Sequence, residues 1–280
     1  MLSETGARAP SEVIAYYSQG REQNRLTQSQ GQLEFARTQE LIQRYIAPAP
    51  ARVLDVGGGA GIYAFWLAQA GYEVHLIDAT PLHVEQAKAT QANSPHPLAS
   101  IEPGDARKLS QPDNTADAVL LLGPLYHLTD ATDRQAALRE AYRVLKPGGI
   151  VFAAAISRYA SLLDGLRLNF ASDLHFASLI DSDLLDGQHR NPTGEDGYFT
   201  TAYFHYPADL ENEVKAGAFT NVKLLAIEGI GWLTTHFESF WEDDVKRQHL
   251  MEWVRKLETE PALLGASSHL MAIGYKPDLP

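Results

Sequence analysis

The sequence predicts an α/β protein, with a doubly wound, mostly parallel sheet, helices on both faces, and a helical and aromatic lid. Short apolar runs alternate with helical patterns across residues 52–155, which is typical of a parallel sheet. A glycine loop joins the first of these runs to the helix that follows it. After residue 157 the alternation is lost. At roughly 150 residues per domain, the 280 residues fit one or two domains.

The first half of the predicted sheet has clear boundaries. Pro48 ends the first helix, and Gly71 lies where a glycine usually follows a helix end. Thr80 is expected to cap the next helix, with Pro81 at its first helical position. The elements expected up to this point are a helix at 33–46, a strand at 52–56, a helix at 62–70 and a strand at 74–78.

The second half repeats the pattern before it becomes irregular. Thr132 and Gln135 have the spacing of a capping box at the start of a helix, and Pro147-Gly148-Gly149 is expected to stop that helix. The further strands expected are 98–101, 118–122, 150–155, 222–227 and 269–275, with a helix at 208–216.

The interruptions suggest a division of the chain into four parts. We expect an N-terminal helical lid segment at 1–46 and a cofactor-binding core at 51–156. An aromatic-rich lid insertion follows at 157–206. The chain then returns to the core over 207–280, with a second insertion at 230–262.

Composition excludes several classes of function. The formal charge is 23 − 35 = −12, which disfavours a polyanionic nucleic acid as partner. Without cysteine there is no disulfide, thiolate zinc site or cysteine nucleophile. The longest clean apolar run, 150–156, is too short to span a bilayer, and the first residues do not read as a secretory signal. We therefore expect a cytoplasmic protein without a membrane partner; a monomer and a homodimer both remain open.

The glycine loop, Gly57-Gly58-Gly59-Ala60-Gly61, indicates a ligand held close to the backbone. The dinucleotide fingerprint would need a glycine where Ile62 stands, so a nicotinamide-dependent oxidoreductase is a weaker alternative. A phosphate-binding P-loop would need a Lys-Ser/Thr pair there. What matches is D-x-G-x-G-x-G, beginning at Asp55.

With this motif, the chain resembles the class I S-adenosylmethionine-dependent methyltransferase family over about residues 51–155. The resemblance implies a Rossmann-like fold, S-adenosyl-L-methionine as cofactor and S-adenosyl-L-homocysteine as product. It places Asp78, with Ala79, at the cofactor ribose, and Asp105 at the adenine amino group. Four further residues are expected to line the cofactor site: Gly104, Ala106, Leu122 and Gly61.

Carboxylates suit these roles on chemical grounds, because one carboxylate accepts hydrogen bonds from two neighbouring hydroxyls. Asp55 is expected to brace the glycine loop or attract the cationic sulfonium end. The N-terminal stretch resembles a subgroup of bacterial small-molecule methyltransferases, on the residues Tyr16-Tyr17, Arg21, Arg25, Leu33-Glu34-Phe35 and Arg37. That resemblance implies that Tyr17 and one of the arginines, with Arg25 chosen here, close over the cofactor.

The acceptor chemistry is less constrained. His127, directly after the fourth strand, is the candidate general base, and His175, His205 and His236 are its rivals. No H-E-x-x-H or comparable spacing predicts a metal site. Aromatic residues of the insertions, together with Tyr126 and His127, are expected to line an acceptor pocket, and from the insertions we select Tyr203 and Trp232. The predicted function is methyl transfer to oxygen or nitrogen of a small molecule. The alternatives are a non-catalytic S-adenosylmethionine-binding protein with a partner-binding lid and a protein-directed methyltransferase.

Overall fold

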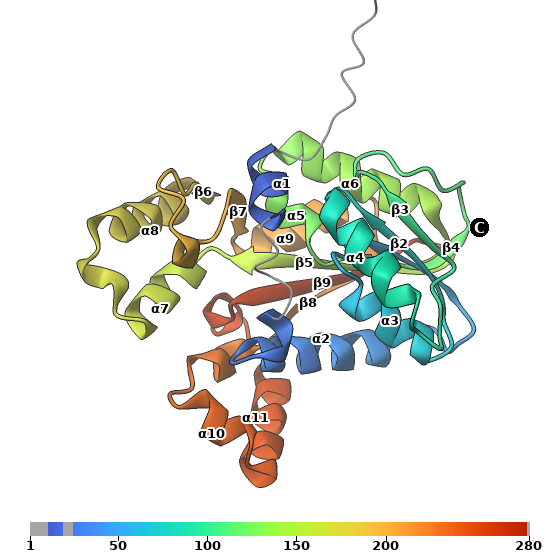
Figure 1. The fold of residues 1–280 in the computed structure, drawn as a ribbon. Helices are drawn as coiled ribbons and strands as arrows, with labels where there is room; N and C mark the ends of the chain where they lie inside the picture. Colours follow the sequence, from blue (N-terminus) through green and yellow to red (C-terminus); the bar gives the residue numbers. More distant parts are fainter. Residues whose placement is uncertain (1–10, 19–24, 279–280) are drawn as a thin grey trace, which may run out of the picture.

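A computed structural model describes residues 11–18 and 25–278. Its central sheet has the strand order β3-β2-β1-β4-β5, and the partners of β1, β2, β3 and β4 are parallel (Figure 1). The strands are β1 (Arg52–Val56), β2 (Glu73–Asp78), β3 (Ser100–Pro103), β4 (Ala116–Leu121), β5 (Leu145–Ser157), β6 (Gln188–His189), β7 (Ala202–His205), β8 (Thr220–Ala226) and β9 (His269–Tyr275). β9 pairs antiparallel with both β5 and β8, so the sheet is mostly parallel, as predicted.

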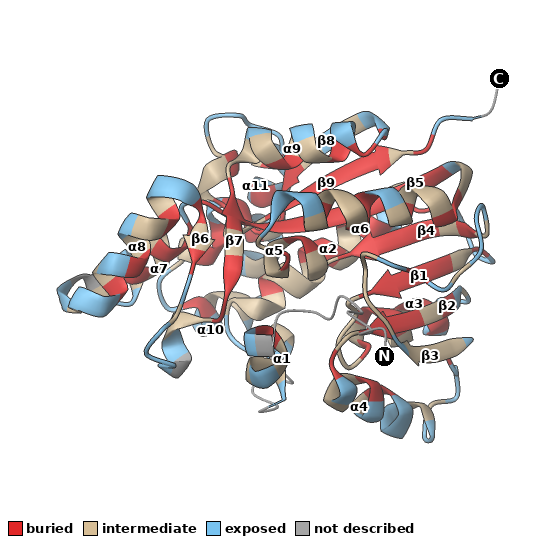
Figure 2. Ribbon diagram, turned by 90° about the horizontal axis from the view of Figure 1, so that it is seen from above, coloured by how far each residue is buried: buried red, intermediate tan, exposed pale blue. Residues whose placement is uncertain are grey.

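Helices cover both faces of this sheet because its central strands are apolar on both sides. Val53 on one face and Leu54 on the other are fully buried, in two separate core clusters. The first face packs against α2 (Gly31–Tyr45), α3 (Ile62–Gln69) and α4 (Pro81–Gln91). The second packs against α5 (Pro124–His127), α6 (Ala131–Val144) and α9 (Pro207–Ala216). Figure 2 shows the buried strands between the partly exposed helices.

The remaining helices form two projections beside the sheet (Figure 1). One contains α7 (Ala160–Arg167) and α8 (Leu174–Asp186), and the other contains α10 (Phe237–Trp241) and α11 (Asp244–Leu257). The second projection packs on α2 through a cluster that includes Leu33, Phe237 and Leu250. The short helix α1 (Ser11–Tyr17) belongs to neither projection. None of the described helices has the length and apolarity needed to cross a membrane.

The structure confirms the predicted fold class and corrects several local details. Thr80 occupies the N-cap position of α4, but its side chain makes no capping hydrogen bond. The cap of α6 is Asp130, which accepts from the Thr132 amide at 2.7 Å, so the expected capping box is wrong. α6 also ends at Val144, before Pro147, because β5 already begins at Leu145.

The stretch 157–206 also contributes a strand that the sequence pattern missed. β7 pairs parallel with the carboxyl end of β5, through Ile156 with Phe204 and Ser157 with His205. β4 stops pairing with β5 at Ala153, and β9 pairs along the opposite edge, so β7 continues the edge that β4 leaves. Because only four residues form it, β7 shows no alternation long enough to recognise.

Candidate functional site

Three adjoining cavities lie at the carboxyl ends of the parallel strands, where open α/β sheets bind ligands. The glycine-loop cavity, about 160 Å³, is lined by Asp55, Gly57–Ala60 and Leu122 among others. The acidic cavity, about 120 Å³, is lined by Asp78, Ala79, Gly104, Asp105, Ala106 and His127 among others. The aromatic cavity, about 330 Å³, is lined by rings that include Phe199, Phe204 and Trp232. Tyr126 lines all three, so they are neighbours around this residue.

The glycine loop turns sharply from β1 into α3. Gly57, Gly59 and Gly61 have φ values of +71°, +60° and +91°, which residues other than glycine rarely adopt. A Cβ at Gly57 would lie 2.7 Å from Pro124 Cγ. Gly57 and Gly59 line the glycine-loop cavity, whereas Gly61 is the N-cap of α3 and serves the turn itself.

Asp55 is the most unusual group at this site. It is fully buried at the end of β1, it lines the glycine-loop cavity, and neither carboxylate oxygen has a hydrogen-bond partner among the described residues. Burial, with a smaller contribution from the charge of Asp78, raises the pKa of Asp55 to about 7. An unpaired buried carboxylate is costly, so the site suits a cationic ligand that restores its charge and pairs with it. Asp55 makes no hydrogen bond to the glycine loop itself, although the backbone amide of Ala64 in α3 acts to lower its pKa.

Asp78 has a structural role that the sequence did not reveal. One oxygen accepts from the Gly59 amide at 2.8 Å, and the other accepts from the Thr80 amide at 2.8 Å. His83 Nδ1 lies 3.2 Å from the second oxygen. The carboxylate thus ties the glycine loop to the start of α4, and it also lines the acidic cavity.

Replacing Asp78 with alanine should therefore weaken S-adenosylmethionine binding at least tenfold, about 1.4 kcal/mol, and lower the melting temperature. The reason is that the loop loses its anchor together with the proposed ribose contact. Calorimetric titration of the folded variant measures the first effect and a thermal melt the second. An unchanged affinity for S-adenosylmethionine would contradict the placement of Asp78 at the cofactor ribose.

Asp105 faces the acidic cavity but is already paired. Arg107 donates to its two oxygens at 2.9 and 2.6 Å, and the same guanidinium reaches Asp133 at 2.6 Å. The expected contact to an adenine amino group therefore has to use the remaining lone pairs of a carboxylate that Arg107 orients. Arg107 follows Asp105 by two residues, but nothing in the sequence marked it as part of the site.

The N-terminal residues close over the cavities from outside. The Tyr17 hydroxyl lies 2.7 Å from His127 Nε2, and Tyr17 lines the acidic and aromatic cavities. Arg25 lines the glycine-loop and aromatic cavities and forms an ion pair with Glu34. Arg21 lies outside the described residues. Arg37 is not a cavity residue: it is fully buried between α2 and α11, in contact with Glu258.

His127 is poorly placed to act as a base. Its Nδ1 lies 3.3 Å from the Thr201 carbonyl, which can only accept, so in the neutral ring Nδ1 carries the proton and Nε2 accepts from Tyr17. Loss of hydration lowers the pKa of His127 to about 4. The ring lines the acidic cavity and is not among the residues lining the aromatic one.

His127→Ala should consequently reduce melting temperature and S-adenosylmethionine affinity together, because Tyr17 loses its hydrogen bond. The pH profile of turnover should keep its shape. Differential scanning calorimetry and a cofactor titration test this. A variant with unchanged cofactor affinity and kcat lower by about 10²–10⁴-fold would instead restore His127 as the base.

Of the two insertion residues expected in the acceptor pocket, Trp232 lines the aromatic cavity and Tyr203 does not. Trp232 lines the aromatic cavity, with its Nε1 donating to the Ala266 carbonyl at 2.8 Å. Tyr203 does not line it, and the prediction is wrong: its ring lies 3.8 Å from the Arg134 guanidinium carbon and hydrogen-bonds Arg158. Neighbouring side chains of a strand point to opposite faces, and the inward residue is Phe204. His175 and His236 are exposed, and His205 is buried against Glu213, outside this cavity.

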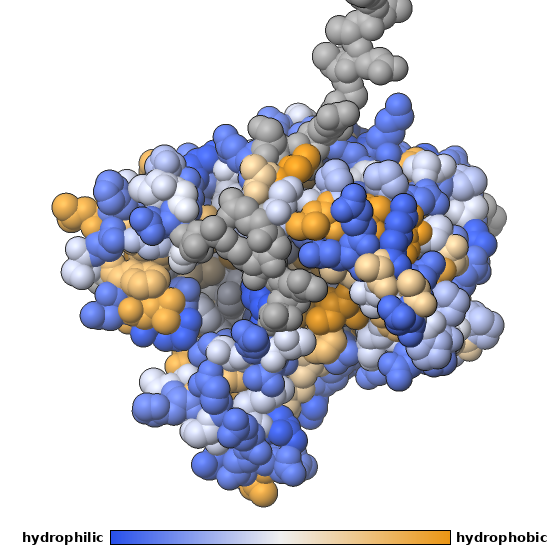
Figure 3. Space-filling view, in the orientation of Figure 1, coloured by the Kyte–Doolittle hydropathy of each residue, from blue (hydrophilic) through white to orange (hydrophobic). Residues whose placement is uncertain are grey.

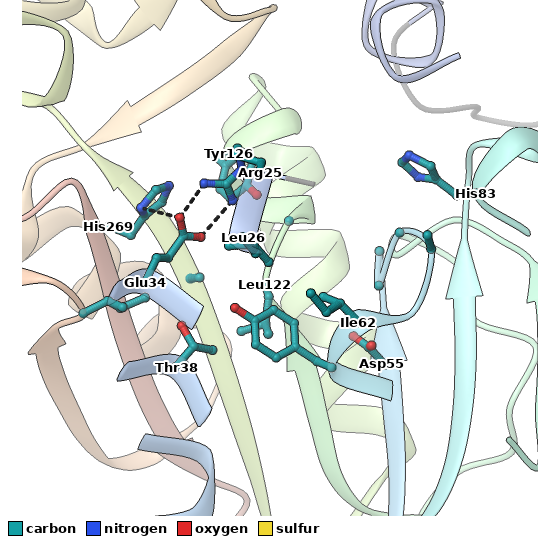
Figure 4. Close-up of a pocket in the computed structure, with 18 of the residues that line it drawn as sticks. Arg25, Leu26, Glu34, Thr38, Asp55, Ile62, His83, Leu122, Tyr126 and His269 are labelled. Carbon is teal, nitrogen blue, oxygen red and sulfur yellow. Dashed lines mark hydrogen bonds and ion pairs between the residues drawn. The ribbon is translucent and has the colours of Figure 1, made fainter. Parts of the chain in front are cut away.

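His269, which the sequence did not suggest, lies where the glycine-loop and aromatic cavities meet. Its Nδ1 is 2.6 Å from Glu228 Oε1. The same nitrogen is 3.7 Å from Glu34 Oε2, as Figure 4 shows by a dashed line. Glu34 belongs to α2, Glu228 follows β8, and His269 begins β9. No local motif joins residues so far apart in the chain, and Glu34 alone stood within a recognised pattern.

Comparisons with known proteins agree with this geometry. Residues 54–153 match the family model described as a methyltransferase domain. The ubiquinone/menaquinone biosynthesis C-methyltransferase UbiE of Ruegeria sp. (strain TM1040) is 36% identical over 127 residues, 44% of this chain and 49% of that protein. A ubiquinone biosynthesis O-methyltransferase of Xanthomonas axonopodis pv. citri (strain 306) is 35% identical over 42% of this chain and 48% of its own length. The chain thus spans about half the length of these curated relatives.

A solved S-adenosylmethionine-dependent methyltransferase from Methanosarcina mazei has the same fold over most of the chain. Its TM-score is 0.57 at 19% identity, with 85% of this chain and 98% of that chain covered.

Proposed function

We propose that the chain, whose residues 54–153 match the family model of a methyltransferase domain, transfers a methyl group from S-adenosylmethionine to oxygen or nitrogen of a small molecule. When bound, this cofactor supplies an electrophilic methyl group on a sulfonium cation. The chain's own contribution is to hold donor and acceptor in line, which is worth roughly 7–11 kcal/mol in well-oriented reactions.

The observation that carries the proposal is Asp55. Its buried, unpaired carboxylate lines the glycine-loop cavity, where a cation would relieve the cost of its ionisation. The cofactor has two cationic groups, an ammonium and a sulfonium, at the same end. We assign that end to the glycine-loop cavity and the adenosine end to the acidic cavity, with Asp78 at the ribose and Asp105 at the adenine.

A small acceptor fits the aromatic cavity better than a macromolecule does. The cavity of about 330 Å³ lies between the core and segments from α1, α7 and α8, which leaves room for a compound of one or two rings. The net charge of −12 disfavours a nucleic-acid substrate. We place this reaction in the cytoplasm, acting on a freely diffusing acceptor.

Proton release tests the proposal directly. Because the pKa of Asp55 is raised from 3.8 to about 7 in the free protein, this group is mostly protonated in weakly acidic solution. A bound cation favours the ionised form, so binding should release a proton below about pH 7, and affinity should rise with pH and level off above it. Calorimetry of S-adenosylmethionine binding in buffers of different ionisation enthalpy measures the released proton.

Asp55→Asn should bind more weakly and without proton release. Identical proton release in this variant would contradict the role of Asp55. A screen of phenols, amines and carboxylates with methyl-labelled cofactor then tests transfer itself. Binding without transfer to any of them would favour the non-catalytic alternative.

A further inference from the structure

His269 is held firmly in one orientation. The two oxygens of Glu228 accept from His269 Nδ1 at 2.6 Å and from its backbone amide at 2.9 Å. The Ser267 hydroxyl lies 3.0 Å from the second oxygen, and Glu228 is almost fully buried. A carboxylate that fixes one nitrogen of a histidine determines which nitrogen carries the proton and where the other one points.

The second nitrogen of His269 is available. With the proton on Nδ1, Nε2 carries the lone pair, and among residues 11–18 and 25–278 the hydrogen bond of the His269 ring is the one that Nδ1 makes to Glu228. The ring lines both the glycine-loop cavity and the aromatic cavity. It therefore stands between the place assigned to the cationic end of the cofactor and the place assigned to the acceptor.

The other histidine, aspartate and arginine side chains that line the aromatic cavity among the described residues already have partners. His189 uses both nitrogens, with Nδ1 at 3.0 Å from Asp183 and Nε2 at 2.7 Å from the Tyr198 carbonyl. Asp164 pairs with Arg167 at 2.6 Å, and Arg25 pairs with Glu34.

We propose that His269 is the general base of this enzyme, and that its acceptor is a phenolic hydroxyl compound bound in the aromatic cavity. The inference deepens the proposed function and rests on it. The acceptor O–H bond breaks, its proton passes to His269 Nε2, and the oxygen forms the new bond to the methyl carbon. The carbon–sulfur bond breaks with its electron pair on sulfur, and the imidazolium later returns the proton to water.

The lining of the cavity supports a phenol. Rings of Phe176, Phe199, Phe204 and Trp232 form much of its wall, and aromatic rings pack favourably against an aromatic acceptor. An ordinary phenol has a pKa of about 10, as in tyrosine, so it is almost entirely protonated at neutral pH. It needs a base at the acceptor oxygen, and His269 lines the cavity with a nitrogen, Nε2, that can accept the proton.

The charges around His269 make it a stronger base than free histidine. Burial lowers the pKa of His269, but Glu34 from α2 and Glu228 after β8 outweigh this, against a smaller opposing effect of Arg25. The pKa of His269 is therefore raised above the ordinary value for histidine. Glu228 acts through His269 and is a positioning residue.

Ionisation of a bound phenol provides a test that does not require turnover. The probe is 4-nitrophenol, whose ionised form absorbs at longer wavelength, added to the complex of the protein with S-adenosylhomocysteine below the probe's own pKa. If His269 takes the proton, the ionised-to-neutral ratio of bound probe should exceed that of free probe about tenfold, one pKa unit. In His269→Gln the ratio should fall to that of free solution.

Two further variants distinguish loss of the proposed base from loss of its orientation and from a general effect of replacing a histidine. Glu228→Gln keeps an oxygen for Nδ1 but loses the charge, so its ratio should be intermediate. His249→Gln changes an exposed histidine on α11 and should match wild type. Bound but un-ionised probe in the wild type would overturn the role of His269. Absence of probe binding to a complex that does hold S-adenosylhomocysteine would overturn the phenolic acceptor. Failure of S-adenosylhomocysteine to bind would overturn the proposed function itself.

Discussion

Gly59→Val should weaken S-adenosylmethionine binding at least a hundredfold, about 2.8 kcal/mol. Gly59 has φ +60° and lines the glycine-loop cavity, and a Cβ there meets no protein atom nearer than His83 at 3.9 Å. The added side chain therefore projects into space that the cofactor needs. It also strains the backbone by roughly 1–2 kcal/mol, since left-handed conformations disfavour branched residues.

Gly71→Val separates these two effects. Gly71 has a similar φ of +92° but lies after α3, where its Cβ would face Ala49 at 3.7 Å. This variant should lose comparable thermal stability and keep wild-type cofactor affinity. Calorimetric titration and thermal melts of both proteins make the comparison. A Gly59→Val protein that binds within threefold of wild type would contradict the placement of the cofactor.

Arg37→Met should cost about 3 kcal/mol of unfolding free energy, in the range for breaking a buried ion pair. Its guanidinium is fully buried and contacts Glu258 and Glu40 at 2.5 Å each, and its Nε donates to the Ile227 carbonyl at 3.1 Å. Removing it leaves that carbonyl and part of the Glu258 charge unpaired. We place the loss at the lower end of the range because Arg44 also reaches Glu258.

Arg44→Met is the matched control. Arg44 pairs with the same two carboxylates, but its side chain is 29% exposed. Ion pairs with this access to water contribute about 1 kcal/mol or less. Urea unfolding followed by circular dichroism should rank the two variants clearly. Equal losses would show that burial of Arg37 adds nothing.

Local patterns predicted several elements of the core at their correct places in the chain. The strand at 52–56, the glycine loop and the strand at 269–275 coincide with β1, its turn and β9, because each depends on neighbouring residues alone. The expected places of Asp78, Asp105 and Gly57 along the cavities follow from the order of strands in a parallel sheet.

The acceptor side depends on contacts that a local pattern does not contain. Tyr203 and Phe204 differ by one position in a four-residue strand, and only the pairing of β7 with β5 decides which ring points inward. His127 stood at the right strand end, but Tyr17, 110 residues away, takes its Nε2. His269 gains its orientation from Glu228, which lies 41 residues earlier.

The aromatic cavity is lined by a different part of the chain from the glycine-loop cavity. Among the described residues that line it, Tyr126 alone falls within 54–153, the segment matched by the family model. The glycine-loop cavity takes most of its walls from inside that segment. If the proposed roles of the two cavities hold, substitutions, insertions and deletions outside 54–153 would change the acceptor cavity more than the donor cavity, although Arg25, Glu34 and His269 also line the latter. Proteins that share this arrangement would then differ in acceptor through their flanking segments and would align with one another mainly over the segment that corresponds to 54–153.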